Sequence, residues 1–211
     1  MNWSIDMEGR DRWNSRFDTD EYIFGTQPNR FLTQQAHRLP AGSKVLAIAD
    51  GEGRNGVWLA EQGHRVTSVD ISERGQAKAA RLAQERGVTL DLRIEDVVEW
   101  DYPDAAFDAV VGIFIQFTAP EGRKRMFSGM KRATRPGGLI LLEGYRPKQL
   151  DYATGGPKQL ENLYTEELLR HHFGDWSIEH LESYDREISE GAGHHGMSAL
   201  IDLVAQRPAM A

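Results

Sequence analysis

Residues 44–56 read KVLAIADGEGRNG, and this stretch decides the fold. It opens with a short apolar run that is typical of a strand covered on both faces. Gly51, Gly53 and Gly56 follow in the spacing G-x-G-x-x-G, where a helix-like segment begins. Glycines at this point permit a tight turn and let a ligand approach the backbone beside the first amides of a helix. The stretch therefore predicts a strand, a ligand-binding turn and a helix.

A second apolar strand, 65–70, ends in the carboxylate of Asp70. Its separation from the glycines is close to the roughly 20-residue offset of an acid that binds ribose hydroxyls. The order of strand, turn, helix, strand and acid fits a nicotinamide or flavin dinucleotide, and it equally fits S-adenosylmethionine, because both ligands carry an adenosine ribose. The competing interpretation makes Asp70 a polar strand end or a helix cap.

Short apolar runs alternate with helix-like segments along most of the chain, as in βαβ units that build a parallel sheet. The predicted strands are 45–49, 65–70, about 89–94, 107–115 and 139–144, and the predicted crossover helices are 54–62 and 72–86. Thr118 and Glu121 have the spacing of a capping box for a further helix that runs to about residue 132. The segment Arg-Pro-Gly-Gly at 135–138 predicts the turn into the fifth strand.

About 67 residues follow the fifth strand, and they predict a helix over 165–173 and two strands over 176–188 and 197–206. A dinucleotide enzyme usually needs a larger substrate-binding region, so this short remainder favours S-adenosylmethionine. The acidic segment 95–97, Glu-Asp-Val, follows the third strand and offers a carboxylate and an amide to an adenine ring. An ordinary acidic loop is the alternative.

Residues 1–43 differ from the rest because aromatic side chains are interleaved with charges. The aromatic residues are Trp3, Trp13, Phe17, Tyr22, Phe24 and Phe31. We expect an amphipathic cover over the ligand site; the alternative is that these rings only pad one side of the sheet, where aromatic burial is stabilising in any case.

The length of 211 residues suits one α/β domain with its own core. We therefore expect a single domain over 1–211. Within it, 1–43 is the predicted cover, 44–144 the predicted cofactor-binding core, and 145–211 a C-terminal helix with antiparallel strands.

Composition excludes several classes of function. The chain has 25 Lys and Arg against 32 Asp and Glu, a net charge of −7, which is the wrong sign for binding nucleic acid through phosphates. The absence of cysteine removes disulfides, thiolate metal sites and cysteine nucleophiles. No apolar run approaches the roughly 20 residues of a membrane span. We expect a cytoplasmic protein with a small-molecule substrate and no nucleic-acid or membrane partner; the oligomeric state is left open.

With these residues in hand, the chain resembles the class I S-adenosylmethionine-dependent methyltransferases, and among them the group around the tellurite-resistance and thiopurine methyltransferases. The matching segments are 13–17, 24–29, 45–55, 69–72, 95–97, 107–110 and 135–138. The resemblance implies a Rossmann-like, seven-stranded and mostly parallel sheet with helices on both faces and an antiparallel last strand. It also implies S-adenosylmethionine bound across the C-terminal ends of the strands.

The resemblance implies a role for individual residues of this site. Glycines contact the methionine moiety, an acid binds the ribose, and apolar residues flank the adenine and the sulfonium. The implied cofactor residues are Gly51 and Gly53 for methionine, Asp70 for ribose, Ile71 for the adenine ring, Asp96 and Val97 for the adenine edge, Ile113 below the sulfonium, and Trp13 and Arg16 from the cover.

The chain departs from the family pattern in its first motif. Ala47 and Ala49 stand where the family usually has an acid and a glycine, and Asp50 stands where a small residue is commoner. Two roles for Asp50 remain open. It accepts a hydrogen bond from the ammonium group of the cofactor, or it caps the helix that begins near Arg54.

The candidates for substrate binding are chosen by position, after strands four and five and in the last loop. They are Gln116, Tyr145, Arg146, His194 and His195. Arg146 suits an anionic substrate, although an arginine in a polar loop is often only solvated. Two adjacent histidines without a third ligand are poor evidence for a metal, so we expect metal-free catalysis. The sequence identifies no catalytic residue.

The predicted function is methyl transfer from S-adenosylmethionine to a small-molecule acceptor, such as a thiol or a chalcogen oxyanion. A nucleophile already deprotonated at neutral pH would need no general base. Two alternatives remain at this stage. The G-x-G-x-x-G spacing alone also fits an NAD(P)-binding oxidoreductase, and the altered first motif also fits a non-catalytic module that keeps the cofactor fold.

Overall fold

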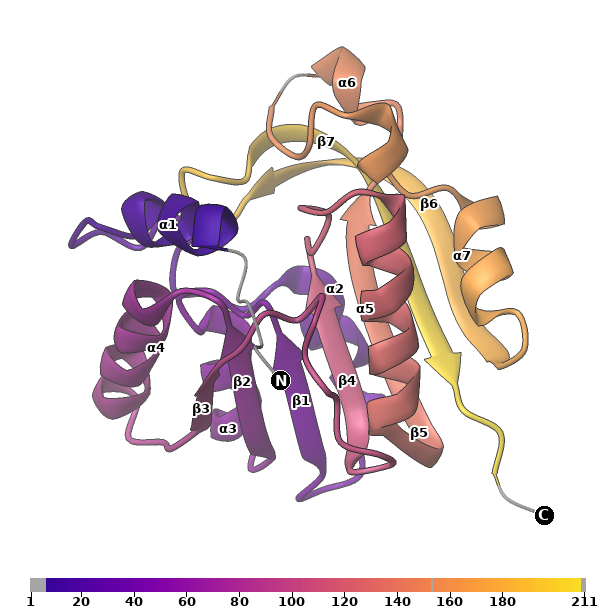
Figure 1. The fold of residues 1–211 in the computed structure, drawn as a ribbon, viewed down its shortest axis with the longest axis horizontal. Coiled ribbons are helices and arrows are strands. Elements are labelled where there is room, and N and C mark those ends of the chain that lie inside the picture. The colour runs from indigo at the N-terminus through magenta and orange to yellow at the C-terminus, as the bar shows by residue number, and fades with distance from the viewer. Residues whose placement is uncertain (1–6, 153, 210–211) are drawn as a thin grey trace.

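A computed structural model describes residues 7–152 and 154–209 of the chain. Within these residues, seven strands form one sheet in the order β3-β2-β1-β4-β5-β7-β6 (Figure 1). The pairs from β3 to β5 are parallel, whereas β7 runs antiparallel to both β5 and β6. The predicted α/β fold, with its antiparallel last strand, is confirmed.

The strands lie close to their predicted positions. Their bounds are β1 Lys44–Ile48, β2 Arg65–Asp70, β3 Asp91–Ile94, β4 Phe107–Ile113, β5 Thr134–Tyr145, β6 Ser177–Ser189 and β7 His195–Gln206. The helices are α1 Met7–Arg16, α2 Arg30–Gln35, α3 Arg54–Glu61, α4 Glu73–Glu85, α5 Pro120–Ala133, α6 Gln149–Tyr152 and α7 Glu166–Phe173, with 3-10 turns η1 Ala36–Arg38 and η2 Leu160–Asn162.

Alternate residues of β1 enter two separate cores, as the two-residue period of a strand requires. Leu46 and Ile48 pack in a cluster with side chains of α5 and α7. Val45 and Ala47 point to the other face, where they pack with Phe31 of α2 and with residues of α3. Helices therefore cover both faces of the sheet, which explains the continuous apolarity of its central strands (Figure 1).

Two of the predicted helices begin at side-chain caps. The Ser72 hydroxyl accepts a hydrogen bond from the Gly75 amide at 3.0 Å, and α4 ends before Gly87, whose φ is +70°. The Thr165 hydroxyl accepts from the Leu168 amide at 3.1 Å and caps α7. Local side-chain chemistry thus fixes the ends of these helices.

Two local predictions were wrong. No capping box opens α5, because Ala119 occupies the N-cap position and Pro120 starts the helix. The segment 135–138 lies inside β5 rather than before it, at an irregularity where the pairing shifts between β4 and β5. The short helix α6, which follows β5, was not predicted. Trp3, which we assigned to the N-terminal cover, lies outside the described residues.

Substitution of Gly53 tests how tightly the glycine turn packs. The φ angle of Gly53 is +85°, and an added Cβ would lie 2.5 Å from the Cβ of Ala79 on α4. Gly63 has the same φ but open space around it. We expect Gly63→Ala to reduce the free energy of unfolding by about 1 kcal/mol through backbone strain alone. Gly53→Ala should cost a further ~1–3 kcal/mol through overpacking. Urea denaturation of both variants measures the difference, and equal losses would show that α4 does not confine the turn.

Candidate functional site

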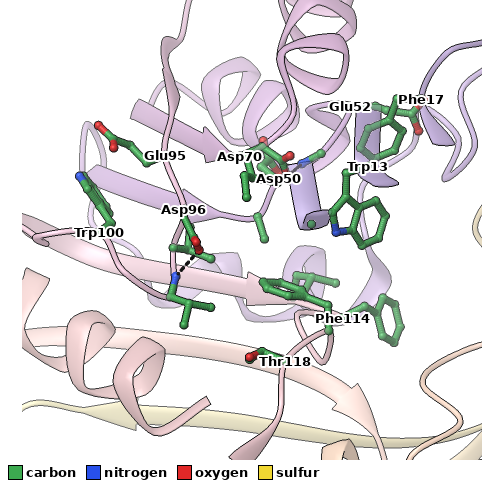
Figure 2. Close-up of a pocket in the computed structure, with 18 of the residues that line it drawn as sticks. Trp13, Phe17, Asp50, Glu52, Asp70, Glu95, Asp96, Trp100, Phe114 and Thr118 are labelled. Atoms are coloured by element: carbon green, nitrogen blue, oxygen red, sulfur yellow. Dashed lines mark hydrogen bonds between the residues drawn. The ribbon is translucent and has the colours of Figure 1, made fainter. Parts of the chain in front are cut away.

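A pocket of about 800 Å³ lies where the carboxyl ends of β1, β2 and β4 meet the N-terminal helix α1. Figure 2 shows Trp13 and Phe114 at one end, Glu95 and Trp100 at the other, and Asp50 and Asp70 between them. Ligand sites of open α/β sheets lie at this edge, where the order of the strands reverses. Here the reversal falls between β1 and β4.

The glycine turn forms the floor of the pocket and is tied to the end of β2. Asp70 is buried, and its two carboxylate oxygens accept hydrogen bonds from the Gly51 amide and the Ser72 amide, both at 2.9 Å. Ala49 has a φ of +47° and Gly51 a φ of +58°. The turn thus keeps a left-handed residue at position 49, although that residue is alanine and must bear the strain of the conformation.

Asp50 points beneath the turn. Its carboxylate accepts hydrogen bonds from the Ser68 hydroxyl at 2.9 Å and from the Gly56 amide, in the first turn of α3, at 3.2 Å. N-terminal capping of α3 is therefore observed, whereas contact with a cofactor ammonium stays a prediction. Burial raises the pKa of Asp50 to about 7 and that of Asp70 to about 6, because the loss of hydration outweighs the hydrogen bonds that each carboxylate accepts and, for Asp50, the nearby charge of Arg54.

The opposite wall of the pocket follows β3. The Asp96 carboxylate accepts a hydrogen bond from the Val98 amide at 3.0 Å, and Val97 is buried (Figure 2). Ile71 and Ile113 also line the pocket. A flat apolar slot between aliphatic side chains, with a carboxylate at its edge, suits a purine ring.

Aromatic rings of the N-terminal segment cover one end of the pocket. Trp13 stacks on Phe17 with ring centroids 5.5 Å apart, and Phe17 meets Phe24 edge to face at 6.2 Å. The Arg16 guanidinium lies over the rings of both Trp13 and Phe24, 5.3 and 5.1 Å from their centroids. We call Trp13, Phe24, Phe114 and His194 the aromatic end of the pocket.

Most of the predicted cofactor residues line this pocket. Those that do are Trp13, Asp50, Gly51, Asp70, Ile71, Asp96, Val97 and Ile113. Arg16 and Gly53 do not. The Arg16 guanidinium lies over the cover rings of Trp13 and Phe24, and Gly53 faces α4, so its missing Cβ makes room for Ala79 rather than for a ligand.

Of the predicted substrate residues, His194 alone lines the pocket. Gln116 is buried, and its side-chain amide donates to the carbonyls of Tyr145 and Asn162 at 2.9 and 3.0 Å. Arg146 forms an ion pair with Asp185, and His195 is exposed at the start of β7. Gln116 and Arg146 are thus engaged in internal contacts, which position along the chain could not reveal.

Tyr145 contacts the pocket indirectly. Its hydroxyl lies 2.6 Å from Nδ1 of His194, and its ring stacks on Phe114 at 4.7 Å. His194 is sandwiched between Phe24 at 4.7 Å and Phe114 at 4.4 Å. Burial, with Arg54 and Arg16 nearby, lowers the pKa of His194 to about 3, so this imidazole is neutral at pH 7.

Sequence reasoning missed Glu52, which lies between the two glycines that were singled out. Its carboxylate is buried and binds Lys78 and two amides of the cover. It also missed the buried ion pair between Arg54 and Glu190, with 2.7 Å between nitrogen and oxygen. No periodicity marks such contacts, because the partners lie far apart in the sequence.

Within the described parts of the chain, no group of three or more His, Cys, Asp or Glu side chains is placed to hold a metal ion. No helix among the described residues has the length and apolarity needed to cross a bilayer.

Residues 45–138 match a family described as a methyltransferase domain. Over 145 residues the chain is 35% identical to a phosphatidylethanolamine N-methyltransferase of Cereibacter sphaeroides, a match that covers 65% of this chain and 68% of that protein. The chain belongs to the class I S-adenosylmethionine-dependent methyltransferases. It spans only about half or less of the length of the next curated relatives.

Solved structures share the fold of this methyltransferase. One, from a study of the conversion of a disulfide bond into a thioacetal group during echinomycin biosynthesis, has a TM-score of 0.78 at 15% identity and covers 94% of this chain and 92% of that one. TehB from Haemophilus influenzae has a TM-score of 0.71 at 18% identity, covering 94% and 67%. At these identities the likeness establishes the fold alone.

Family membership identifies S-adenosylmethionine as the cofactor and removes the nicotinamide alternative. The pocket fits the cofactor on its own chemistry, because it combines a glycine turn, a buried carboxylate at the end of β2 and an apolar slot. The methyltransferase assignment from the sequence is thus confirmed at the level of the superfamily.

The pKa of Asp50 predicts how stability depends on pH. The folded protein binds this proton more tightly than the unfolded chain, where the pKa is 3.8, so the contribution of Asp50 to stability is present below about pH 4 and is lost as pH rises through about 7. Asp50→Asn cannot ionise; its oxygen can still accept the Gly56 amide, and its nitrogen can donate to the Ser68 hydroxyl, which then acts as acceptor. We expect the variant to gain stability relative to wild type between pH 4.5 and 7.5, by at most about 1.4 kcal/mol per pH unit. Parallel curves of unfolding free energy against pH would contradict the raised pKa.

Proposed function

We propose that this methyltransferase acts on a small-molecule acceptor that arrives as an anion with a soft donor atom, such as a thiolate or a chalcogen oxyanion. The observation that supports this most strongly is the aromatic end of the pocket, where His194 is neutral and the Arg16 guanidinium lies over the ring of Phe24, 5.1 Å from its centroid. Arg54 is paired with Glu190, so Arg16 is the cation that favours an anion over a protonated amine at this end.

The residues that the sequence predicted for the cofactor would hold it in this pocket. Each carboxylate oxygen of Asp70 accepts one backbone amide and keeps a further lone pair for a ribose hydroxyl. Ile71 and Val97 would flank the adenine, Asp96 its edge, and Gly51 the methionine moiety. S-adenosylmethionine supplies the methyl group as an electrophilic carbon on a sulfonium. Ile113 and the aromatic end would then flank the sulfonium.

His194 then orients the acceptor rather than removing a proton from it. Two stacked rings and the hydroxyl of Tyr145 hold the imidazole in place, and a base with a pKa of about 3 accepts protons poorly at neutral pH. An acceptor that is already deprotonated needs only to be held near the methyl carbon, with water excluded. Catalysis by positioning of the acceptor fits a pocket whose one end is covered by aromatic side chains.

Kinship with the tellurite-resistance and thiopurine methyltransferases is part of this proposal. Its support is the motif set in the first 43 residues, together with the fold shared with TehB over 94% of this chain.

We also propose the three-part organisation into a cover over 1–43, a cofactor-binding core over 44–144 and a C-terminal part over 145–211. The relative from Cereibacter sphaeroides is named for an amine-bearing lipid. Amines are therefore the competing class of acceptor.

A screen with cofactor labelled on the methyl group tests the proposal. The panel contains small thiols, selenite and tellurite, phenols, amines and dispersed phosphatidylethanolamine. We expect label to pass to at least one thiol or chalcogen oxyanion, and to few amines, because the Arg16 guanidinium beside the aromatic end disfavours a cationic acceptor. Transfer to amines alone would contradict the acceptor class, and cofactor binding without any transfer would favour a non-catalytic module.

His194→Ala is the matching variant for the aromatic end. It should lower the turnover number for the best acceptor by about 10- to 100-fold while changing cofactor affinity little, because orientation of the acceptor is lost. His171→Ala, on the exposed surface of α7, is the control and should leave the rate unchanged. Equal rates for wild type and His194→Ala would remove this residue from the site.

A further inference from the structure

Glu52 occupies the position between Gly51 and Gly53 and is one of the residues that line the pocket, yet its side chain is almost wholly buried. Only 1% of the side chain is exposed. Burying a carboxylate is costly unless charges and hydrogen bonds compensate for its lost hydration. The contacts of Glu52 therefore identify what this acid is for.

Both carboxylate oxygens of Glu52 accept hydrogen bonds from backbone amides of the cover. Oε1 accepts the Ile23 amide and Oε2 accepts the Phe24 amide, both at 3.1 Å. The Lys78 ammonium of α4 donates to Oε1 at 2.6 Å and also to the Glu21 carbonyl at 2.5 Å. One residue of the glycine turn thus binds two successive amides of the N-terminal segment, and its charge is balanced from α4.

The segment that Glu52 binds, residues 21–25, reaches the far side of the pocket. We call it the strap. The Ile23 carbonyl accepts a hydrogen bond from the Gly193 amide at 2.9 Å, and the ring of Phe24 stacks on His194 at 4.7 Å. The strap therefore joins the glycine turn to the loop between β6 and β7, and its central ring is a wall of the aromatic end.

From this chain of contacts we infer that Glu52 is a positioning residue that couples the glycine turn to the aromatic end. The inference rests on the proposed function in taking that end as the place of the acceptor. A cofactor that orders the turn orders Glu52, and through the amides of Ile23 and Phe24 it orders the strap and the loop that carries His194. Cofactor binding then prepares the acceptor site, and by reciprocity the acceptor tightens cofactor binding.

The competing account treats Glu52 and Lys78 as a buried ion pair that only stabilises the fold. The two accounts differ in what a ligand on the turn does to the strap. Glu52→Gln keeps the size of the side chain but presents an amide nitrogen where a carboxylate oxygen now accepts an N–H group. Glu52→Asp keeps the charge beside Lys78 but is too short for both amides. The contacts to the strap weaken in both variants.

Hydrogen exchange of the full chain, with and without S-adenosylhomocysteine, distinguishes the accounts. In the wild type we expect the ligand to slow exchange of residues 21–25 and 191–194 by about tenfold or more, within the usual range of coupling between sites. In Glu52→Gln the ligand should still bind, while its effect on both segments falls to about twofold or less. Arg123→Met is the control, because Arg123 is a buried cation on α5 that donates to the Glu161 carbonyl and does not contact the strap.

Two results would refute the coupling. The first is that the ligand slows exchange of both segments in Glu52→Gln as strongly as in the wild type. The second is that Arg123→Met loses as much protection as Glu52→Gln, because the effect would then be one of general stability. Should Glu52→Gln not fold, Glu52→Asp carries the same test, with an intermediate loss expected and full protection contradicting the inference. Failure of the wild type to bind S-adenosylhomocysteine would instead overturn the cofactor site itself.

Discussion

The carboxylate of Asp70 is the constraint on which the pocket depends. It accepts hydrogen bonds from the amides of Gly51 and Ser72, and so fixes the glycine turn to the end of β2. Asp50 lies beneath the same turn, and burial raises the pKa of both acids. Two buried carboxylates side by side are an expensive arrangement for folding alone. A cationic ligand would offset that cost, which is what a sulfonium cofactor provides.

Buried charges on the opposite side of the turn connect the N-terminal segment to the last hairpin. Arg54, the first residue of α3, pairs with Glu190 beside β6. The Asn29 side chain donates to Glu190 and to the buried Glu143 of β5, and its backbone amide donates to Asn55 at 2.9 Å. Breaking one member would leave others unpaired in a dry environment, so these elements are expected to keep their mutual positions. These buried contacts hold together the three distant parts of the chain that form the aromatic end.

The elements most accessible to prediction were those whose signal is local. Val45 to Gly56 and Arg65 to Asp70 carry periodicity, glycines and a terminal acid in the right order, and the strands and turn lie where expected. The cap of α5 was not predictable in this way, because Pro120 overrides the apparent capping box. Gly53 was assigned to a ligand although it faces Ala79, since the sequence does not show which neighbour needs the space of a missing Cβ. Glu52 carried no local signal at all.

Calorimetric titration with S-adenosylhomocysteine tests the central claim most directly, with wild type, Asp70→Ala and Asp108→Ala compared. Asp108 is the matched control, because its carboxylate also accepts a backbone amide, from Lys44 at 2.7 Å, but at the opposite end of the strands. The account predicts one site in the wild type, an affinity lower by about 1–3 kcal/mol in Asp70→Ala, and no change in Asp108→Ala. Unaltered binding by Asp70→Ala would contradict the assignment of this carboxylate, and with it the place of the cofactor in the pocket.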